Sequence, residues 1–310
     1  MLHLRLLVPA DLTAGVLDHL QSTAGVAHVV HMPGAGVVPP GDVVLCDVAR
    51  EVADAVIEWL QDLGVHHAGA ITAVPLDTVV SDAAARAEGR APGLGADALV
   101  WEEVEARART DAELSSSFLV FMAIASVIAG VGILLDSPIL IVGAMVVGPE
   151  YGPMSALCIA AARRRRAAVR RALVTLAAGL VAAAAVSLVA TVAYRATGIA
   201  PDEYELGERQ LTAFISHPDG MAAVVAVVAG ITGMLSITQA RSGSLVGVLV
   251  SVTTIPAVAN VGVATAYGEW SEVGGAGLQL AVNVAGLVAA GIATLVVQAR
   301  ATGRVLTASR

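Results

Sequence analysis

The sequence contains no lysine, only two cysteines and 3% aromatic residues. Cys46 falls in a polar stretch and Cys158 in an apolar one, so we expect no disulfide between them, and their spacing is not that of a cysteine metal site. Because lysine is absent, all 18 residues counted as lysine or arginine are arginine. The net charge of -8 is spread unevenly, which argues against nucleic acid as a partner.

Catalytic motifs are also missing. The sequence has no His-Glu-x-x-His run, and its apolar stretches hold neither a pair of aspartates nor a Ser/His constellation. No helix pattern follows directly after Gly34 and Gly36, which weakens a phosphate-cradle interpretation. We therefore expect no enzyme activity and no cofactor. Residues 1–11 lack a basic region followed by a long apolar core, so we expect no cleavable signal peptide.

Hydrophobic residues make up 56% of the chain, and they are concentrated after Ser115. Several stretches reach the roughly 20 residues that a membrane helix needs. We predict an α-helical polytopic protein of the lipid bilayer. Its six spans are predicted at 116–135, 139–162, 172–194, 220–237, 245–267 and 275–297.

An arginine cluster between the second and third spans predicts the orientation. It comprises the run 163–166 together with Arg170 and Arg171. Short arginine-rich loops stay in the cytoplasm, which places both termini inside and the acidic loop 202–205 outside. We therefore predict a multi-pass protein of the plasma membrane with cytoplasmic termini.

The region before the spans predicts a separate α+β domain. Residues 1–77 show strand and helix patterns in the order βαββαβ, which is that of the ferredoxin-like split unit. The Gly/Pro-rich stretch 33–41 predicts a long hairpin tip. Residues 78–114 are predicted to be a linker and a charged connector helix, 115–298 the membrane domain and 299–310 a cytosolic tail.

Four histidines form two clusters, His28/His31 and His66/His67. A metal site is one interpretation. In the usual ferredoxin-like strand order, however, the second and fourth strands lie on opposite edges of the sheet, which separates the two clusters. We therefore predict surface histidines and no metal site within one chain. A metal shared between subunits is the alternative.

The second span is interrupted at its centre by Gly148, Pro149, Glu150, Gly152 and Pro153. A charged group at that depth costs about 3 kcal/mol or more. Proline withholds a backbone donor, and lipid tolerates broken backbone only where protein or a water-filled cavity satisfies its polar groups. The segment therefore predicts a break that faces a protein interior and a functional site at the carboxylate.

An internal repeat supports this interpretation. Residues 129–135 resemble 229–235, and 142–146 resemble 246–250, where the second copy is interrupted at Pro256. With three spans each, the halves are inverted, and paired broken helices in inverted halves are typical of secondary transporters with midplane sites. The polar residues predicted at that depth are Glu150, Tyr151, Thr253, Thr254, Asn260 and Asn283.

Some of these residues also fit purely structural roles. Threonine in a membrane helix often bonds to its own backbone, so the threonines alone carry little weight. Gly148 and Gly152 are spaced as a helix-packing face, and small residues recur in several spans. These small-residue faces also predict a homo-oligomer.

The run Asp136-Ser137-Pro138, followed by 142–149, resembles a prokaryotic membrane family catalogued as domain of unknown function 389. Similar residues recur in the second half, at Ile255-Pro256 and Asn283, so the resemblance covers about 115–297. Many members carry Pro-Leu-Met-Gly-Pro where this chain has 149–153, so Glu150 departs from their pattern. The resemblance implies a membrane domain and brings no assigned activity.

Two functions follow as hypotheses. The first is a transporter or channel for an unidentified small solute or ion, with a midplane site and a regulatory cytosolic domain. The second is a membrane-anchored sensor or scaffold whose ferredoxin-like domain binds a ligand or partner. Flux that depends on Glu150 separates the first from the second.

Overall fold

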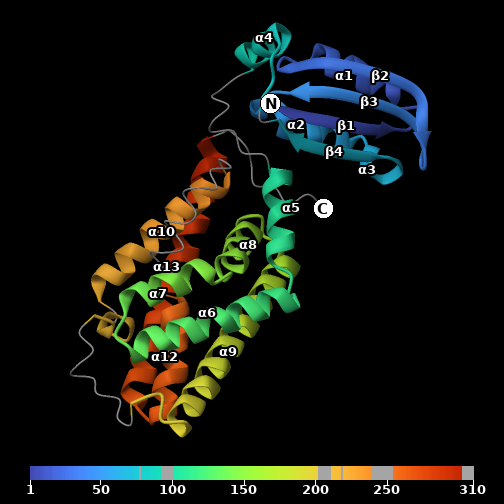
Figure 1. Ribbon diagram of the computed structural model, residues 1–310. Helices are drawn as coiled ribbons and strands as arrows, with labels where there is room; N and C mark the ends of the chain where they lie inside the picture. Colours follow the sequence, from blue (N-terminus) through green and yellow to red (C-terminus); the bar gives the residue numbers. More distant parts are fainter. Residues whose placement is uncertain (77, 92–100, 202–210, 218, 239–253, 302–310) are drawn as a thin grey trace. The chain divides into compact units, whose positions relative to one another are not determined.

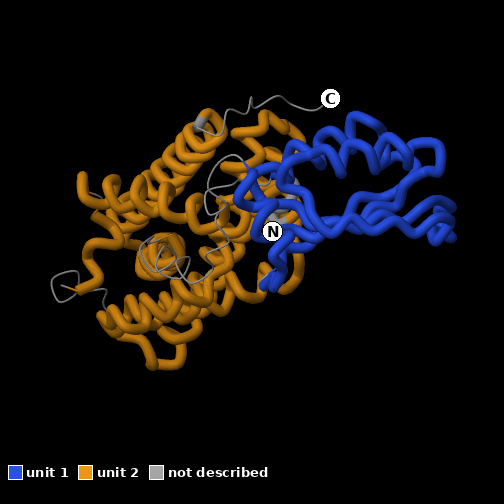
Figure 2. Tube along the Cα trace, turned by 90° about the horizontal axis from the view of Figure 1, so that it is seen from above, with its two compact units in different colours: residues 1–103 blue, residues 104–310 orange. Residues whose placement is uncertain are grey.

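The computed structural model describes the chain except for residues 77, 92–100, 202–210, 218, 239–253 and 302–310. It forms two compact units, residues 1–103 and 104–310, which are coloured separately in Figure 2.

The first unit contains a four-stranded antiparallel sheet in the order β2-β3-β1-β4. Its elements are β1 (Leu2–Val8), α1 (Thr13–Ser22), β2 (Val26–Val37), β3 (Pro40–Val48), α2 (Arg50–Asp62), α3 (Val65–Ala68), β4 (Ala70–Pro75) and α4 (Asp82–Arg90). The order of strands and long helices is the predicted one, with the one-turn helix α3 added before the last strand. As predicted, β2 and β4 form opposite edges.

The core of this unit follows from the period of two along β1. Leu2, Leu4, Leu6 and Val8 are all buried, whereas the residues between them are more exposed. Helices α1 and α2 contribute side chains at helical spacing to the same core; these are Val16, Leu20, Val56, Ile57 and Leu60. Fully burying each such side chain contributes about 1.5–3 kcal/mol.

Two predictions for this unit need correction. The stretch predicted as a long hairpin tip is mostly paired strand, because Gly36 pairs with Gly41 and Val37 with Pro40. The segment predicted as a linker contains α4. Ser81 explains this helix, because its Oγ accepts the N–H groups of Ala83 and Ala84 and so caps the helix N-terminus.

The second unit is helical in its described parts (Figure 1). Its elements are α5 (Trp101–Asp111, which begins in the first unit), α6 (Ser116–Leu134), α7 (Pro138–Val147), α8 (Tyr151–Ala162), α9 (Arg166–Ala196), the 3-10 helix η3 (Ala213–Ile215), α10 (Gly220–Thr238), α12 (Thr254–Tyr267) and α13 (Trp270–Ala301). Ser137 precedes Pro138 at the first position of α7, where a missing N–H costs nothing.

Four helices in the described parts are long and apolar enough to cross a membrane, namely α6, α9, α10 and α13. The pair α7 and α8 makes a fifth if it is counted as one bent span. The second unit is therefore a membrane domain, but the predicted number of six spans is not confirmed. The predicted span 245–267 lies partly outside the described residues, and its described part is the 14-residue helix α12.

The membrane helices pack closely through glycine. A Cβ at Gly230 of α10 would overlap the Leu287 carbonyl oxygen of α13. A Cβ at Gly262 of α12 would lie 2.5 Å from the Ala184 carbonyl oxygen of α9. Only residues without a side chain allow backbones to approach so closely, as is typical of membrane helix interfaces.

Candidate functional site at a broken membrane helix

Helices α7 and α8 are separated by Gly148, Pro149 and Glu150, and they bend by 54° at this point. The structure therefore contains the predicted break. Pro149 has no N–H, and its carbonyl accepts the N–H of Gly152 at 3.2 Å, which starts the first turn of α8. Pro153 follows within that first turn, where an intrahelical donor is not required.

Glu150 is almost fully buried, at 2% exposure. Its Oε1 accepts a hydrogen bond of 2.8 Å from Thr254 Oγ1, which joins the break to α12 across 104 positions of sequence. Its Oε2 is also buried and has no hydrogen-bond partner among the residues that the structure describes. Leaving a buried polar atom unpaired costs about 1–3 kcal/mol, and more when it is charged. The fold alone does not explain why this oxygen is buried without a hydrogen-bond partner.

Glycines make room for the two polar side chains at the break. A Cβ at Gly148 would overlap Glu150 Oε2 and lie 2.6 Å from Ile255 Cγ1. A Cβ at Gly233 of α10 would overlap the Tyr151 hydroxyl oxygen. That hydroxyl is buried and, within the described part of the chain, also lacks a partner. Adjacent residues thus direct two unsatisfied oxygens against glycine backbone.

The other predicted site residues are only partly assembled here. Thr254 contacts Glu150 directly. Asn260 and Asn283 are 2% and 3% exposed, and Asn283 Oδ1 accepts a bond of 3.3 Å from Gln279. No hydrogen bond among the described residues joins either asparagine to Glu150.

Two predicted positions lie at or beyond the edge of the described chain. Thr253 lies outside the described residues, so its predicted place in the site stays a prediction. Pro256 is the third residue of α12 as described, and the predicted break before it falls at the end of an undescribed stretch.

Residues 145–289 match the family model described as Domain of unknown function (DUF389). The chain carries a DUF389 domain. The match begins in α7 and ends in α13, so the DUF389 domain includes the break and both residues of the Glu150–Thr254 bond. No curated protein and no solved structure matches the chain.

Sequence analysis did not identify Gly233 as a residue of this site. It falls in the segment 229–235 that marks the internal repeat, but glycine is common in membrane helices. Its contact with Tyr151 depends on the distance between two helices far apart in sequence, and no local pattern predicts it.

Outside the DUF389 domain, three histidines pair with carboxylates. Asp47 accepts from His3 at 2.7 Å and from His28 at 2.6 Å, and His31 bonds to Asp42 at 3.1 Å. In the described chain, no group of three or more histidine, cysteine, aspartate or glutamate residues is placed to hold a metal ion.

His28 links this network to α4. Its backbone φ is 52°, uncommon for a residue other than glycine, at an irregularity in the β2–β3 pairing. Its Nε2 bonds to Ser81 Oγ at 2.8 Å, which gives a Ser–His–Asp sequence of bonds with Asp47. However, Ser81 Oγ also accepts two α4 N–H groups, so the network caps the helix and ties it to the sheet.

Proposed function

We propose that the membrane domain transports or conducts a small solute or ion, and that the break at Glu150 is its midplane site. The observation that carries this proposal is the buried Oε2 of Glu150, which has no partner in the described chain although it lies at a break between two apolar helices. Ionisable groups inside membrane domains generally line substrate or proton pathways. A carboxylate at a broken helix is suited to bind a cation or exchange a proton.

Helix packing supports the inverted repeat that this function implies. In each half the first helix packs on the last, α6 on α9 and α10 on α13. The second element of each half packs on the last helix of both halves, α8 on α9 and α13, and α12 on α13 and α9. Matching contacts of this kind are expected of two related halves, with α12 as the described part of the predicted fifth span.

The same proposal includes the location, the membrane orientation and the oligomeric state of the protein. The arginine-rich turn between α8 and α9 supports a plasma-membrane protein with cytoplasmic termini and a cytosolic, regulatory N-terminal unit of ferredoxin-like fold. Exposed apolar side chains on α9, such as Val181 and Val189, supply faces for lipid or for a second copy in a homo-oligomer. A mass measurement in mild detergent tests the oligomer.

Flux in liposomes tests the transport function. The purified chain is reconstituted, and proton or monovalent-cation flux is followed with an internal pH-sensitive dye. Glu150→Gln keeps the shape and the bond to Thr254 but removes the titratable group, so we expect flux to fall about ten-fold or more. Glu272→Gln is the matched control, because Glu272 is also buried, at 5% exposure, but lies in the first turn of α13. Equal flux from Glu150→Gln and the parent would remove Glu150 from the pathway.

The sensor function has one observation in its favour. The N-terminal unit contains a cavity of about 370 Å³ between the α1–β2 turn and α4, lined in part by Gln21, Thr23, Arg86 and Arg90. If the parent gives no flux, and a small ligand raises the unfolding temperature of the parent but not of Arg86→Ala, the sensor function is favoured over transport.

A further inference from the structure

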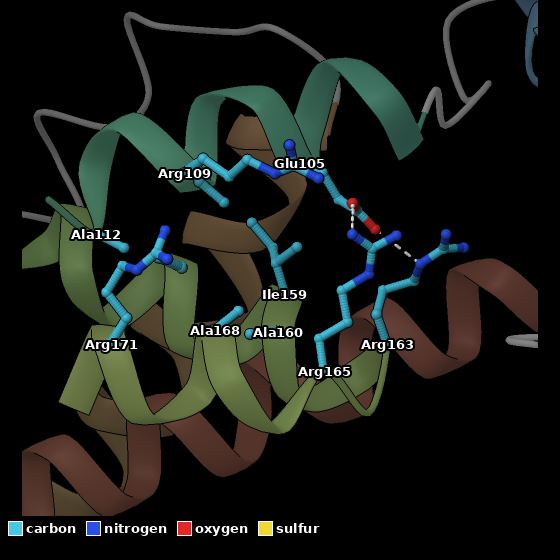
Figure 3. Close-up of a pocket in the computed structure, with 11 residues that line it drawn as sticks. Glu105, Arg109, Ala112, Ile159, Ala160, Arg163, Arg165, Ala168 and Arg171 are labelled. Atoms are coloured by element: carbon cyan, nitrogen blue, oxygen red, sulfur yellow. Dashed lines mark hydrogen bonds and ion pairs between the residues drawn. The ribbon is translucent and has the colours of Figure 1, made fainter. Parts of the chain in front are cut away.

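A second cavity, of about 50 Å³, lies within the membrane unit between α5, α8 and α9 (Figure 3). Its walls are mainly alanines from the three helices together with Ile159. Around them stand four arginines and one glutamate, namely Arg109, Arg163, Arg165, Arg171 and Glu105. Figure 3 shows Arg171 at one end of this cavity and Arg163 and Arg165 at the other.

The charges around the cavity do not balance. Glu105 accepts from Arg163 Nε at 2.8 Å and from Arg165 Nη1 at 2.9 Å, which leaves the carboxylate only 13% exposed. Four guanidinium groups against one carboxylate leave an excess of three positive charges. Within the described chain, no ion pair is formed by Arg109 or Arg171. The Glu105 pairs therefore hold two arginines in place while two others remain available.

The N-terminus of α9 adds to this positive potential. Arg165 is its N-cap residue, no side chain caps the helix, and its first turn contains no acidic residue. The first N–H groups of a helix have no partner within it, and the helix dipole favours an anion at that end. Ala168, the third residue of α9, lines the cavity.

Membrane topology alone does not account for this arrangement. A positive loop requires only that arginines lie between two spans, and Arg164, Arg166 and Arg170 meet that requirement without lining the cavity. Arg109 comes from α5, before the first predicted span, yet it reaches the same cavity. Arginines from separate segments that line one cavity are a feature of a binding site.

We propose that this cavity binds a phosphate group, carried either by an anionic phospholipid headgroup or by a soluble phosphate compound. Guanidinium groups match phosphate oxygens in charge and geometry, and helix N-termini bind phosphate through backbone N–H groups. The cavity lies at the turn between the bent span and α9, and therefore at one face of the membrane, where a headgroup has access.

The test compares two neighbouring arginines in the full chain. Bound lipid is counted by native mass spectrometry after purification with equal amounts of phosphatidylglycerol and phosphatidylcholine. We expect the parent to retain phosphatidylglycerol selectively. Arg171→Ala should lower its occupancy constant about ten-fold, which corresponds to about 1.4 kcal/mol. Arg170→Ala removes the same charge one position away, outside the cavity, and should resemble the parent.

A second arm identifies the source of the phosphate. Inorganic phosphate is titrated against the delipidated chain in detergent, and the unfolding temperature is measured with sodium chloride at matched ionic strength. A rise that Arg171→Ala abolishes assigns the site to soluble phosphate, whereas selective lipid retention without this rise assigns it to a headgroup. Arg109→Ala should reproduce the loss in either arm, and it replaces Arg171→Ala if that variant does not fold. Equal effects of Arg170→Ala and Arg171→Ala, or no effect of phosphate and lipid, would overturn the proposal.

Discussion

Buried carboxylates of the two units differ in their hydrogen bonding. In the N-terminal unit both oxygens of Asp47 are bonded, one to His3 and the other to His28. In the membrane unit one oxygen of Glu150 bonds to Thr254, and the other has no partner among the described residues. A fully bonded carboxylate is explained by the structure that it stabilises. A half-bonded carboxylate at a break between membrane helices costs stability, which points to a role in function.

The largest effect is expected at Gly148, where an added methyl group would meet both Glu150 Oε2 and Ile255. Gly148→Ala should abolish flux by displacing the carboxylate, and overpacking should lower stability by about 1–3 kcal/mol. Gly143→Ala is the control, because a Cβ there meets nothing within 4 Å and alanine favours the helix by about 1 kcal/mol. Liposome flux and unfolding temperature are measured for both. Identical behaviour of the two variants would show that the close approach at the break is not needed.

A smaller effect is expected at Asp47, whose role is structural. Asp47→Asn should destabilise the N-terminal unit by about 1.5–3 kcal/mol, because charged hydrogen bonds to two histidines are lost, and should leave flux unchanged. Hydrogen exchange of β2 and β3 in the full chain measures the first effect. Asp18→Asn, at an exposed position of α1, is the control. A loss of flux in Asp47→Asn with unaltered exchange would contradict the assignment.

The Asp47 contribution should depend on pH. Partial burial opposes ionisation, but the hydrogen bonds from His28 and His3 outweigh it and hold the pKa of Asp47 below its ordinary value. A carboxyl whose pKa is lowered by folding stabilises the protein above its unfolded pKa of about 4, and this stabilisation is lost as the pH falls through the folded pKa. The difference in exchange between parent and Asp47→Asn should therefore shrink below about pH 4.

Local patterns predicted the parts of this structure that depend on neighbouring residues. The patterns along residues 1–77 predicted the order of strands and helices, and the Gly/Pro cluster at 148–153 predicted the helix break. Both follow from backbone geometry within a few residues. The helix α4 was missed because its cap, Ser81, stands in a polar stretch that reads as a linker.

Contacts between distant segments could not be predicted in the same way. The sequence placed Glu150 and Thr254 at similar depth, but nothing local pairs them. The arginines between α8 and α9 were assigned to topology, and the contribution of Arg109 becomes visible only when α5 is packed beside them. Close approach at Gly233 likewise depends on how two helices meet.

The smallest effect on stability is expected from removing the hydroxyl of Tyr151 or of Tyr267 in the membrane unit. The buried hydroxyl of Tyr151 has no partner in the described chain, whereas the Tyr267 hydroxyl donates to the Pro201 carbonyl at 2.7 Å. Tyr151→Phe should therefore raise stability by about 1 kcal/mol, and Tyr267→Phe should lower it by a similar amount.

Flux decides what the Tyr151 hydroxyl does. If the hydroxyl contacts the transported species beside Glu150, the Tyr151→Phe protein should be more stable than the parent but give a lower flux. Functional sites are often maintained at a cost in stability. Unfolding temperature in detergent and liposome flux are measured on the same preparations, with Tyr267→Phe as the control. A Tyr151→Phe protein that is less stable but equally active would mean that the hydroxyl is satisfied in the membrane. The half-bonded carboxylate would then stand alone at the break.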